Sequence, residues 1–332
     1  MATTNTPARV IVTFPLPEQG QRLLENYACK HDWELIQWRD SEINMTRGQF
    51  LDQVNRGADG ILCKMTIRID EDVLARAGDR LKVVSTMTVG CDHIDCCSLK
   101  ARNVPLGHTP GVLTDATADL AVALTLAVCR RLGEAMQAVC NGEWGAWNPT
   151  WLLGTEIRGK TLGVLGLGRI GLATAKRLRA FGVSRLIYHS TKEKPEAAQV
   201  DGEFVTLEQL LRESDILCIC CSLNASTRHM IGYTQLCAMK PTAILVNVAR
   251  GDVIVQDDLE RALREGKIAA AGLDVTTPEP LPPSHPLANM KNCIVLPHIG
   301  SATVETRNAM SVLAVENLLA GLQGRKMPAE YV

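Results

Sequence analysis

Residues 161–181 read TLGVLGLGRIGLATAKRLRAF, and the rest of the chain is organised around this stretch. A short apolar run leads into Gly166, Gly168 and Gly171, and an amphipathic helical pattern follows them. G-x-G-x-x-G between a strand and a helix is typical of dinucleotide-binding units. The first glycine permits a tight turn, the second lets a pyrophosphate approach the backbone, and the third lets the helix pack closely on the strand. A glycine-rich turn in an ordinary α/β domain is the alternative, and the flanking strand and helix favour the nucleotide site.

Composition limits the classes of protein to which the chain can belong. Its 332 residues suffice for two domains, and its formal net charge of -1 provides no basic surface for nucleic acid or an anionic membrane. The first ten residues contain one arginine and no long apolar run, so we expect neither a secretory signal nor a transit peptide. These features predict a cytoplasmic protein with no nucleic-acid partner and no membrane association.

Twelve cysteines are present, many of them inside apolar segments. Without a secretion signal, reduced thiols are the expectation rather than a disulfide framework. Cys218 and Cys221 form a C-x-x-C pattern within the strand-like run DILCICC, and no second pair follows at zinc spacing. The sequence therefore predicts no metal site.

Apolar strands alternate with amphipathic segments from residue 8 onward, which predicts parallel sheets covered by helices. The loops at residues 64–66 and 89–90 follow the third and fourth strands, at the edge where open α/β sheets bind ligands. Val89 and Gly90 could present backbone N–H groups to a carboxylate at this edge. A simple turn glycine is the alternative explanation of Gly90.

Residues 114–139 are expected to form one long helix that joins two domains. The next stretch, NGEWGAWNPTWLLG, carries Trp144, Trp147 and Trp151. Such a concentration of aromatic residues indicates a buried contact, which we expect to be made with a second subunit. Packing on the same domain is the alternative.

After the glycine motif, further strand-like runs bring the total to six strands with intervening helices, a complete dinucleotide-binding domain. The final helix, residues 301–322, is expected to return to the N-terminal lobe. The predicted fold class is therefore α/β, with two Rossmann-like/flavodoxin-like domains, parallel sheets and a cleft between them. We place the substrate-binding domain at residues 1–108 and 300–332, and the dinucleotide-binding domain at residues 109–299.

Three residues with catalytic chemistry, Arg250, Glu279 and His298, each lie beyond an apolar strand of the second half. A guanidinium can pair bidentately with the carboxylate and carbonyl region of a 2-oxo acid. An imidazole can transfer a proton near neutral pH, and a carboxylate beside it stabilises the imidazolium. Taken singly, each residue also has an ordinary explanation as a surface charge, a turn residue or a strand-end histidine.

Together these residues carry a resemblance that covers essentially the whole chain. The segments GLGRIG, NVARGDVI, AGLDVTTPEP and LPHIGSAT resemble the D-isomer-specific 2-hydroxyacid dehydrogenase family, and other segments are most similar to its glyoxylate reductase/hydroxypyruvate reductase branch. The resemblance implies a homodimer of two-domain subunits. It also implies that NAD(P)H reduces small 2-oxo acids, giving glycolate from glyoxylate and D-glycerate from hydroxypyruvate.

The resemblance implies a role for each of the three catalytic residues. Arg250 binds and polarises the substrate, His298 donates the proton in reduction, and Glu279 raises the affinity of His298 for that proton. Val89 and Gly90 would bind the substrate carboxylate, and Arg250 and His298 also lie on the substrate side. Apart from the resemblance, the aromatic density of the tryptophan-rich stretch suggests that Trp147 contacts the substrate side and limits substrate size. The implied cofactor-binding positions are Gly166, Gly168, Arg169, Ile170, Gly171, Ser190, Thr191, Lys192, Ser222, Asp274 and Gly300, of which Asp274 would hold the nicotinamide carboxamide.

Two residues depart from the family's pattern. Ser222 stands where the family often has proline at the adenosine ribose, which leaves the local backbone less constrained. Lys64 stands in the first substrate loop, where an apolar residue is commoner in this branch. Lys64 either adds charge near the substrate or points to solvent.

The end of the second strand of the nucleotide-binding domain bears on cofactor choice. NAD-preferring domains usually place Asp or Glu there. Here the strand ends in His189, Ser190, Thr191 and Lys192, with no carboxylate before Glu193. Two hydroxyls and an ammonium could bind the 2′-phosphate that an Asp would repel, so we predict NADPH as the preferred cofactor, with NADH also possible. The alternative is that Lys192 is a solvated surface charge and both cofactors are used.

Two other functions remain open from the sequence. One is a D-2-hydroxyacid dehydrogenase of broader specificity, and the other is a nucleotide-sensing scaffold or corepressor of the same fold. The intact set of Arg250, Glu279 and His298 argues against the second.

Overall fold

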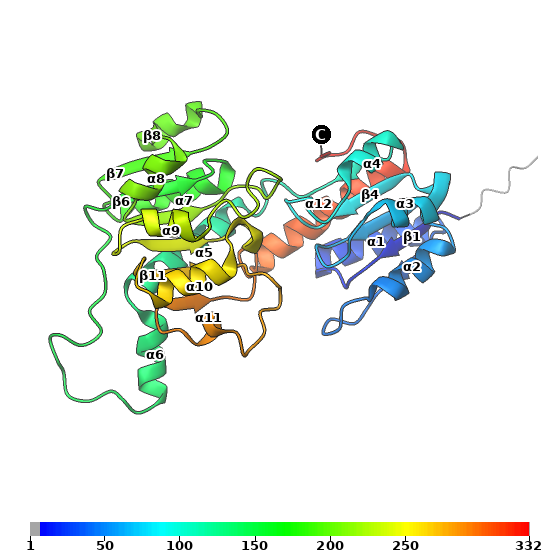
Figure 1. Ribbon diagram of the computed structural model, residues 1–332. Coiled ribbons are helices and arrows are strands. Elements are labelled where there is room, and N and C mark those ends of the chain that lie inside the picture. The colour runs from blue at the N-terminus through cyan, green and yellow to red at the C-terminus, as the bar shows by residue number, and fades with distance from the viewer. Residues whose placement is uncertain (1–6, 332) are drawn as a thin grey trace, which may run out of the picture. The chain divides into compact units, whose positions relative to one another are not determined.

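A computed structural model describes residues 7–331, which divide into two compact units. The first unit comprises the described residues up to Leu113 and those from Ala302 onward, and the second unit comprises Thr114–Ser301. Each unit is an α/β domain built on a parallel sheet, as the sequence predicts (Figure 1). The divisions at residues 113/114 and 301/302 lie close to the boundaries expected from the sequence.

The first unit contains a five-stranded sheet in the order β2-β1-β3-β4-β5. All of its strand pairs are parallel, and its strands are β1 (Arg9–Val12), β2 (Glu34–Gln37), β3 (Gly60–Cys63), β4 (Val83–Thr86) and β5 (Leu106–Gly107). The sequence predicted the first four strands and missed β5, because a pair of residues gives no period-2 pattern. Helices cover both faces of the sheet: α1 (Glu18–Lys30), α2 (Arg47–Asn55), α3 (Glu71–Ala77), α4 (Cys96–Ala101) and α12 (Val304–Leu322).

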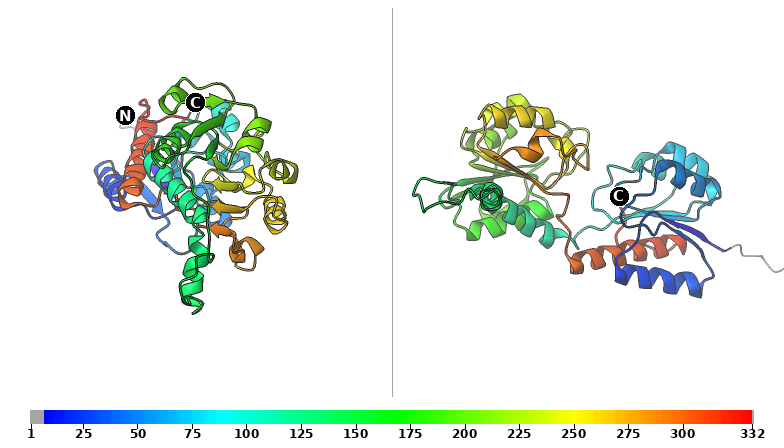
Figure 2. Two further views of the ribbon diagram at one scale, coloured as in Figure 1. Left: turned by 90° about the vertical axis from the view of Figure 1, so that its left-hand side faces the viewer. Right: turned by 90° about the horizontal axis from the view of Figure 1, so that it is seen from below.

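Helix α12 returns to the first unit, as expected for the last helix of the chain. It packs beside α1 on one face of the sheet, with α2, α3 and α4 on the other (Figure 2). The Ser85 hydroxyl donates to the Ala314 carbonyl at 2.8 Å, and the Asn317 amide donates to the His108 carbonyl at 2.9 Å. The helix begins at Val304 rather than Ser301, because the Thr303 hydroxyl caps it by accepting from the N–H of Thr306.

The second unit contains a seven-stranded parallel sheet in the order β12-β11-β10-β9-β6-β7-β8. Its strands are β6 (Thr161–Leu165), β7 (Arg185–His189), β8 (Gly202–Phe204), β9 (Ile216–Ile219), β10 (Ile244–Asn247), β11 (Ala270–Leu273) and β12 (Cys293–Val295). The sequence predicted six of them. It missed β8, a short edge strand that pairs only with β7 and lacks an apolar run.

Strand order reverses between β6 and β9, since the chain continues from β6 to one side and returns to the other. Loops diverge at such a point, and ligands of open α/β sheets bind there at the carboxyl ends of the strands. Helices on the two faces bury alternate residues of the same strands, so the central strands β9 and β10 read as continuous apolar runs. The helices are α5 (Thr114–Cys129), α6 (Leu132–Cys140), α7 (Arg169–Ala180), α8 (Leu207–Glu213), α9 (Tyr233–Ala238), α10 (Gln256–Arg264) and α11 (Pro286–Asn289).

The long helix expected over residues 114–139 is in fact two helices, α5 and α6, so that prediction was wrong. The chain turns at Arg131, whose φ of 54° lies in the left-handed region. The Arg131 guanidinium pairs with Glu134 at 2.7 Å and donates to the Leu153 carbonyl. Hydrophobic periodicity runs through this break, which is why no pattern in the sequence indicates it.

Helix ends elsewhere have common capping residues. Thr206 caps α8 by accepting from the N–H of Gln209 at 3.1 Å, and Gly266 follows α10 with a φ of 66°.

No helix within residues 7–331 combines the length and the apolar character needed to cross a lipid bilayer.

Candidate active site

The glycine loop between β6 and α7 leaves no room for side chains at two of its three glycines. Gly166 has a φ of 95°, and a Cβ there would lie 2.6 Å from the Cα of Cys221. A Cβ at Gly171 would lie 2.2 Å from the carbonyl oxygen of Gly166. At Gly168 nothing lies within 4 Å of such an atom, so the protein itself does not require a glycine at this position.

The amino end of α7 fits the pyrophosphate of a dinucleotide. Gly168 is its N-cap residue, and no side chain caps the helix. The first N–H groups of a helix have no partner within the helix, and its dipole attracts negative charge. Because Gly168 has no side chain and the space beside it is open, a phosphate could reach these backbone N–H groups. The residues present therefore fit the predicted cofactor.

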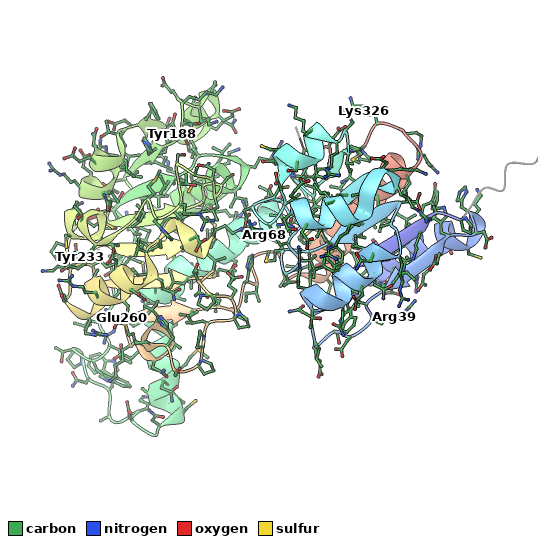
Figure 3. The ribbon with its side chains drawn as sticks, turned by 45° about the vertical axis from the view of Figure 1, so that its right-hand side comes forward. Arg39, Arg68, Tyr188, Tyr233, Glu260 and Lys326 are labelled. Carbon is green, nitrogen blue, oxygen red and sulfur yellow. The ribbon has the colours of Figure 1, made fainter. Side chains whose placement is uncertain are left out.

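Ser190, after β7, is fixed to this loop. Its hydroxyl accepts from the N–H of Leu167 at 2.9 Å and retains its own proton for a ligand. Tyr188, buried in the second unit and labelled in Figure 3, accepts from the N–H of Lys194 at 2.9 Å and so holds the segment that follows. Thr191 and Lys192 between them are exposed. On the other side of β6, the Ser222 carbonyl accepts from the Thr227 hydroxyl at 2.7 Å, which constrains the backbone where the family often has proline.

The loops that follow β10, β11 and β12 bring the three predicted catalytic residues to one edge of the second unit. These strands are neighbours in the sheet, and Arg250, Glu279 and His298 all lie beyond their carboxyl ends. The first two loops touch, since a Cβ at Gly251 would lie 2.2 Å from the carbonyl carbon of Thr276. Three residues that are distant in the sequence thus lie at one edge of the sheet, because parallel strands align their carboxyl ends.

His298 and Glu279 form a hydrogen-bonded pair. Nδ1 of His298 lies 2.8 Å from Oε2 of Glu279, and the two side chains are 24% and 32% exposed. Oε1 of Glu279 accepts from the N–H of Thr276 at 3.2 Å, which orients the carboxylate. With Nδ1 engaged, Nε2 of His298 is the ring nitrogen left to exchange a proton with a ligand.

Asp274 fixes the backbone of the His298 loop. Its carbonyl accepts from the N–H of His298 at 2.9 Å, and its carboxylate accepts from the N–H groups of Ile299 and Gly300, each at 2.8 Å. His298 has a φ of 54°, an unfavourable conformation for a residue with a Cβ. Burial raises the pKa of the Asp274 carboxyl, although the two N–H donors and His298 act in the opposite direction.

The structure thus shows that Asp274 holds the backbone of the His298 loop, whereas the resemblance implied only a contact with the nicotinamide. That task was missed because hydrogen bonds to the backbone of a loop 25 residues away leave no pattern in the sequence.

The predicted substrate-loop residues lie in the first unit, after β4. The Val89 carbonyl lies 3.0 Å from Nδ1 of His108, and the Thr88 hydroxyl donates to the Gly90 carbonyl at 2.8 Å. Because a peptide unit is planar, fixing the Val89 carbonyl also fixes the N–H of Gly90.

Trp147 belongs to the second unit and is 86% exposed, in the segment after α6 that leaves the body of that unit (Figure 1).

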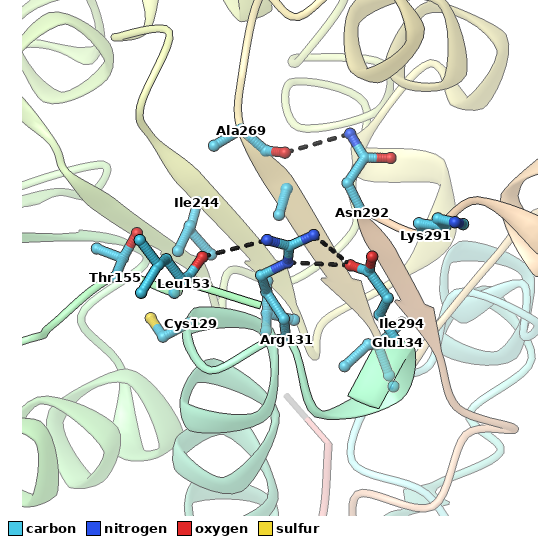
Figure 4. A pocket seen from close by; sticks show the side chains of 14 residues that line it. Cys129, Arg131, Glu134, Leu153, Thr155, Ile244, Ala269, Lys291, Asn292 and Ile294 are labelled. Carbon is cyan, nitrogen blue, oxygen red and sulfur yellow. Dashed lines mark hydrogen bonds and ion pairs between the residues drawn. The ribbon is translucent and has the colours of Figure 1, made fainter. Parts of the chain in front are cut away.

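Two other features of the second unit are not part of this site. A cavity of about 350 Å³ lies at the amino ends of β10 and β11, beside Arg131 and Asn292, and therefore at the opposite edge of the sheet (Figure 4). Burial raises the pKa of the Cys218 and Cys221 thiols to about 12 and about 11, so neither is a reactive thiolate. Among residues 7–331, no cluster of side chains is suited to hold a metal ion.

Comparison with known proteins agrees with this geometry. Residues 122–300 match the model of the D-isomer specific 2-hydroxyacid dehydrogenase, NAD binding domain. The chain is 51% identical over 328 residues to a glyoxylate reductase/hydroxypyruvate reductase of Mus musculus, with 98% of each chain covered. It is 48% identical over 323 residues to the Homo sapiens protein of the same name, with 97% of each covered.

A solved structure gives the same result. The NADPH-dependent glyoxylate/hydroxypyruvate reductase of Sinorhizobium meliloti, in complex with NADP and malonate, superposes with a TM-score of 0.82 at 31% identity, covering 98% of this chain and 97% of that one. The chain therefore belongs to the D-isomer-specific 2-hydroxyacid dehydrogenase family. It is a D-2-hydroxyacid dehydrogenase that uses a nicotinamide cofactor.

A first prediction concerns Asp274. Asp274→Asn keeps one acceptor oxygen and places an NH₂ group against the N–H of Ile299 or Gly300, so the His298 loop loses its fixed conformation. We expect kcat to fall by about tenfold or more and the free energy of unfolding to fall by about 1–3 kcal/mol. Turnover and urea unfolding measure the two effects. Wild-type values of both would show that the carboxylate does not hold the loop.

Proposed function

We propose that this enzyme reduces glyoxylate to glycolate and hydroxypyruvate to D-glycerate, with NADPH as the preferred cofactor. The observation that carries the proposal is the 2.8 Å pair of His298 and Glu279, on loops of the nucleotide-binding sheet adjoining the one that carries Arg250. The names of the mouse and human relatives support the choice of substrates.

Each residue acts by its own chemistry. A reduced nicotinamide bound at the glycine loop would provide the hydride for C2 of the 2-oxo acid. The protonated His298 then gives the proton on Nε2 to the developing alkoxide, while Glu279 stabilises the imidazolium through Nδ1. Arg250 pairs with the substrate carboxylate and carbonyl, and the N–H groups of Val89 and Gly90 bind the carboxylate from the first unit.

The proposal is tested by following NADPH oxidation with purified protein and a panel of 2-oxo acids. We expect kcat/KM for glyoxylate and hydroxypyruvate to exceed that for pyruvate. Higher kcat/KM for 2-oxo acids with large apolar side chains would replace the proposal by a dehydrogenase of broader specificity. No turnover of any member of the panel would contradict the proposal itself.

The pairing of His298 with Glu279 predicts a change in pH dependence. Reduction requires protonated His298, so activity should fall at high pH. Glu279→Gln removes the negative charge that favours the imidazolium, so this fall should move to lower pH. The measurement is kcat/KM for glyoxylate against pH in both proteins. An alkaline limb at the same pH in the variant would remove Glu279 from this role.

The preference for NADPH rests on charge at the end of β7. Arg169 and Lys192 are exposed, and within residues 7–331 neither has a carboxylate at ion-pair distance. Ser190 brings a hydroxyl to the same region through its bond to Leu167. These groups can receive a 2′-phosphate, while Glu193 is the nearest residue that would oppose it.

Ser190→Asp tests this preference. The new carboxylate can still accept from the N–H of Leu167, yet it repels a 2′-phosphate, so KM for NADPH should rise at least about tenfold more than KM for NADH. Ser190→Asn is the control, since it has the same shape without the charge. A wild-type protein that uses NADH as efficiently as NADPH would overturn the preference, and so would equal effects of the two variants.

We also propose that the enzyme is a homodimer in the cytoplasm. Leu132, Met136 and Val139 share one face of α6 and are 47%, 70% and 57% exposed, and Trp147 follows them. An apolar face of this kind is typical of an interface, and we include Trp147 in it. All twelve cysteines carry free thiols, which suits a reducing compartment.

Met136→Glu should weaken this dimer, because the interface would have to bury a charge. Sedimentation velocity over a range of protein concentrations measures the effect, and the exposed neighbour Gln137→Glu is the control. Trp147→Ala should weaken the dimer or change the substrate profile. The proposal would be contradicted if the wild type were monomeric. It would also be contradicted if the Met136→Glu variant formed a dimer as stable as that of the wild type.

A further inference from the structure

Lys64 is the first residue after β3, and it lies beside the loop that holds Val89 and Gly90. In the sheet, Cys63 is in register with Thr86, and the N–H of Met87 donates to the Cys63 carbonyl at 3.0 Å. Neighbouring strands are about 5 Å apart, so the backbone of Lys64 lies alongside Met87, at the beginning of the proposed carboxylate-binding loop. This placement lies entirely within the first unit.

The surroundings of Lys64 are unusual for an ammonium group. The side chain is half-buried, and Nζ lies 5.8 Å from the ring centroid of Phe14, a buried residue that follows β1. Within residues 7–331, no carboxylate lies at ion-pair distance from this ammonium. Burial, and secondarily the positive charge of Arg307 in the first turn of α12, lower the pKa of Lys64.

An ammonium that is partly removed from water, close to a second cation and without a carboxylate, is unfavourable in the free protein. The ring of Phe14 offsets part of this cost. An anion at the carboxyl edge of the sheet would offset more, because it interacts with the half-buried ammonium of Lys64. A bound anion therefore explains the position of the Lys64 ammonium better than a contribution to the stability of the fold does.

We propose that Lys64 binds a carboxylate on the side chain of the substrate, so that the enzyme also reduces short 2-oxo dicarboxylic acids. The inference rests on the proposed function, since it uses the same site and the same reaction. Hydride adds to C2 and a proton to its oxygen, and the product is a 2-hydroxy dicarboxylic acid. Lys64 acts here as a specificity-determining residue. An apolar residue at this position could not pair with the second carboxylate.

The test compares two substrates of the same shape and different charge. Oxaloacetate carries a carboxylate where 4-methyl-2-oxopentanoate carries two methyl groups, so the ratio of their kcat/KM values isolates the effect of the charge. We expect this ratio to exceed one in the wild type, to fall at least about tenfold in Lys64→Met, and to stay within about threefold of wild type in Lys64→Arg. General damage to the site cancels in the ratio.

Two outcomes would overturn the inference: a ratio below one in the wild type, or the same ratio in wild type and Lys64→Met. Binding of D-malate, the product expected from oxaloacetate, gives a readout without turnover and should weaken about tenfold in Lys64→Met. Failure of the proposed function looks different, because the wild type would then reduce neither glyoxylate nor hydroxypyruvate. Glyoxylate reduction with an unchanged charge ratio would contradict only the role of Lys64.

Discussion

The site depends most on the hydrogen bonds that Asp274 accepts from the backbone of the next loop. Its carbonyl accepts from the N–H of His298, and its buried carboxylate accepts from those of Ile299 and Gly300. These bonds offset the cost of the left-handed backbone at His298, which in turn places Nδ1 against Glu279. Asp274, at the end of β11, thus fixes the backbone of the loop that carries His298, while the N–H of Thr276 orients the Glu279 carboxylate.

The parallel arrangement of the strands explains how loops from different parts of the chain come to lie at one edge of the sheet. The carboxyl ends of β10, β11 and β12 lie side by side, so three loops distant in sequence converge without any long connection. The glycine loop follows β6, where strand order reverses, and leaves the helix amino end open for phosphate. The first unit has the same arrangement, since Lys64 follows β3 and Gly90 lies in the loop after its neighbour β4.

The sequence predicted most of the fold, because strand, turn and helix signals are local, and the three candidate catalytic residues that it named lie after the neighbouring strands β10, β11 and β12. Gly166 and Gly171 are required by close contacts that the motif already implies. It missed β5 and β8, which are too short for a pattern, and the break at Arg131, which depends on Glu134 and Leu153. The backbone bonds of Asp274 are tertiary contacts and could not be read from spacing.

The most direct test of this account is the rate of the chemical step in His298→Ala, measured in a single turnover of glyoxylate with saturating NADPH. Deuterium at the transferred position of NADPH identifies hydride transfer. The account predicts a rate at least about a hundredfold below wild type, with the affinity for NADPH retained, because the alkoxide lacks its proton donor. A hydride-transfer rate close to wild type would contradict it.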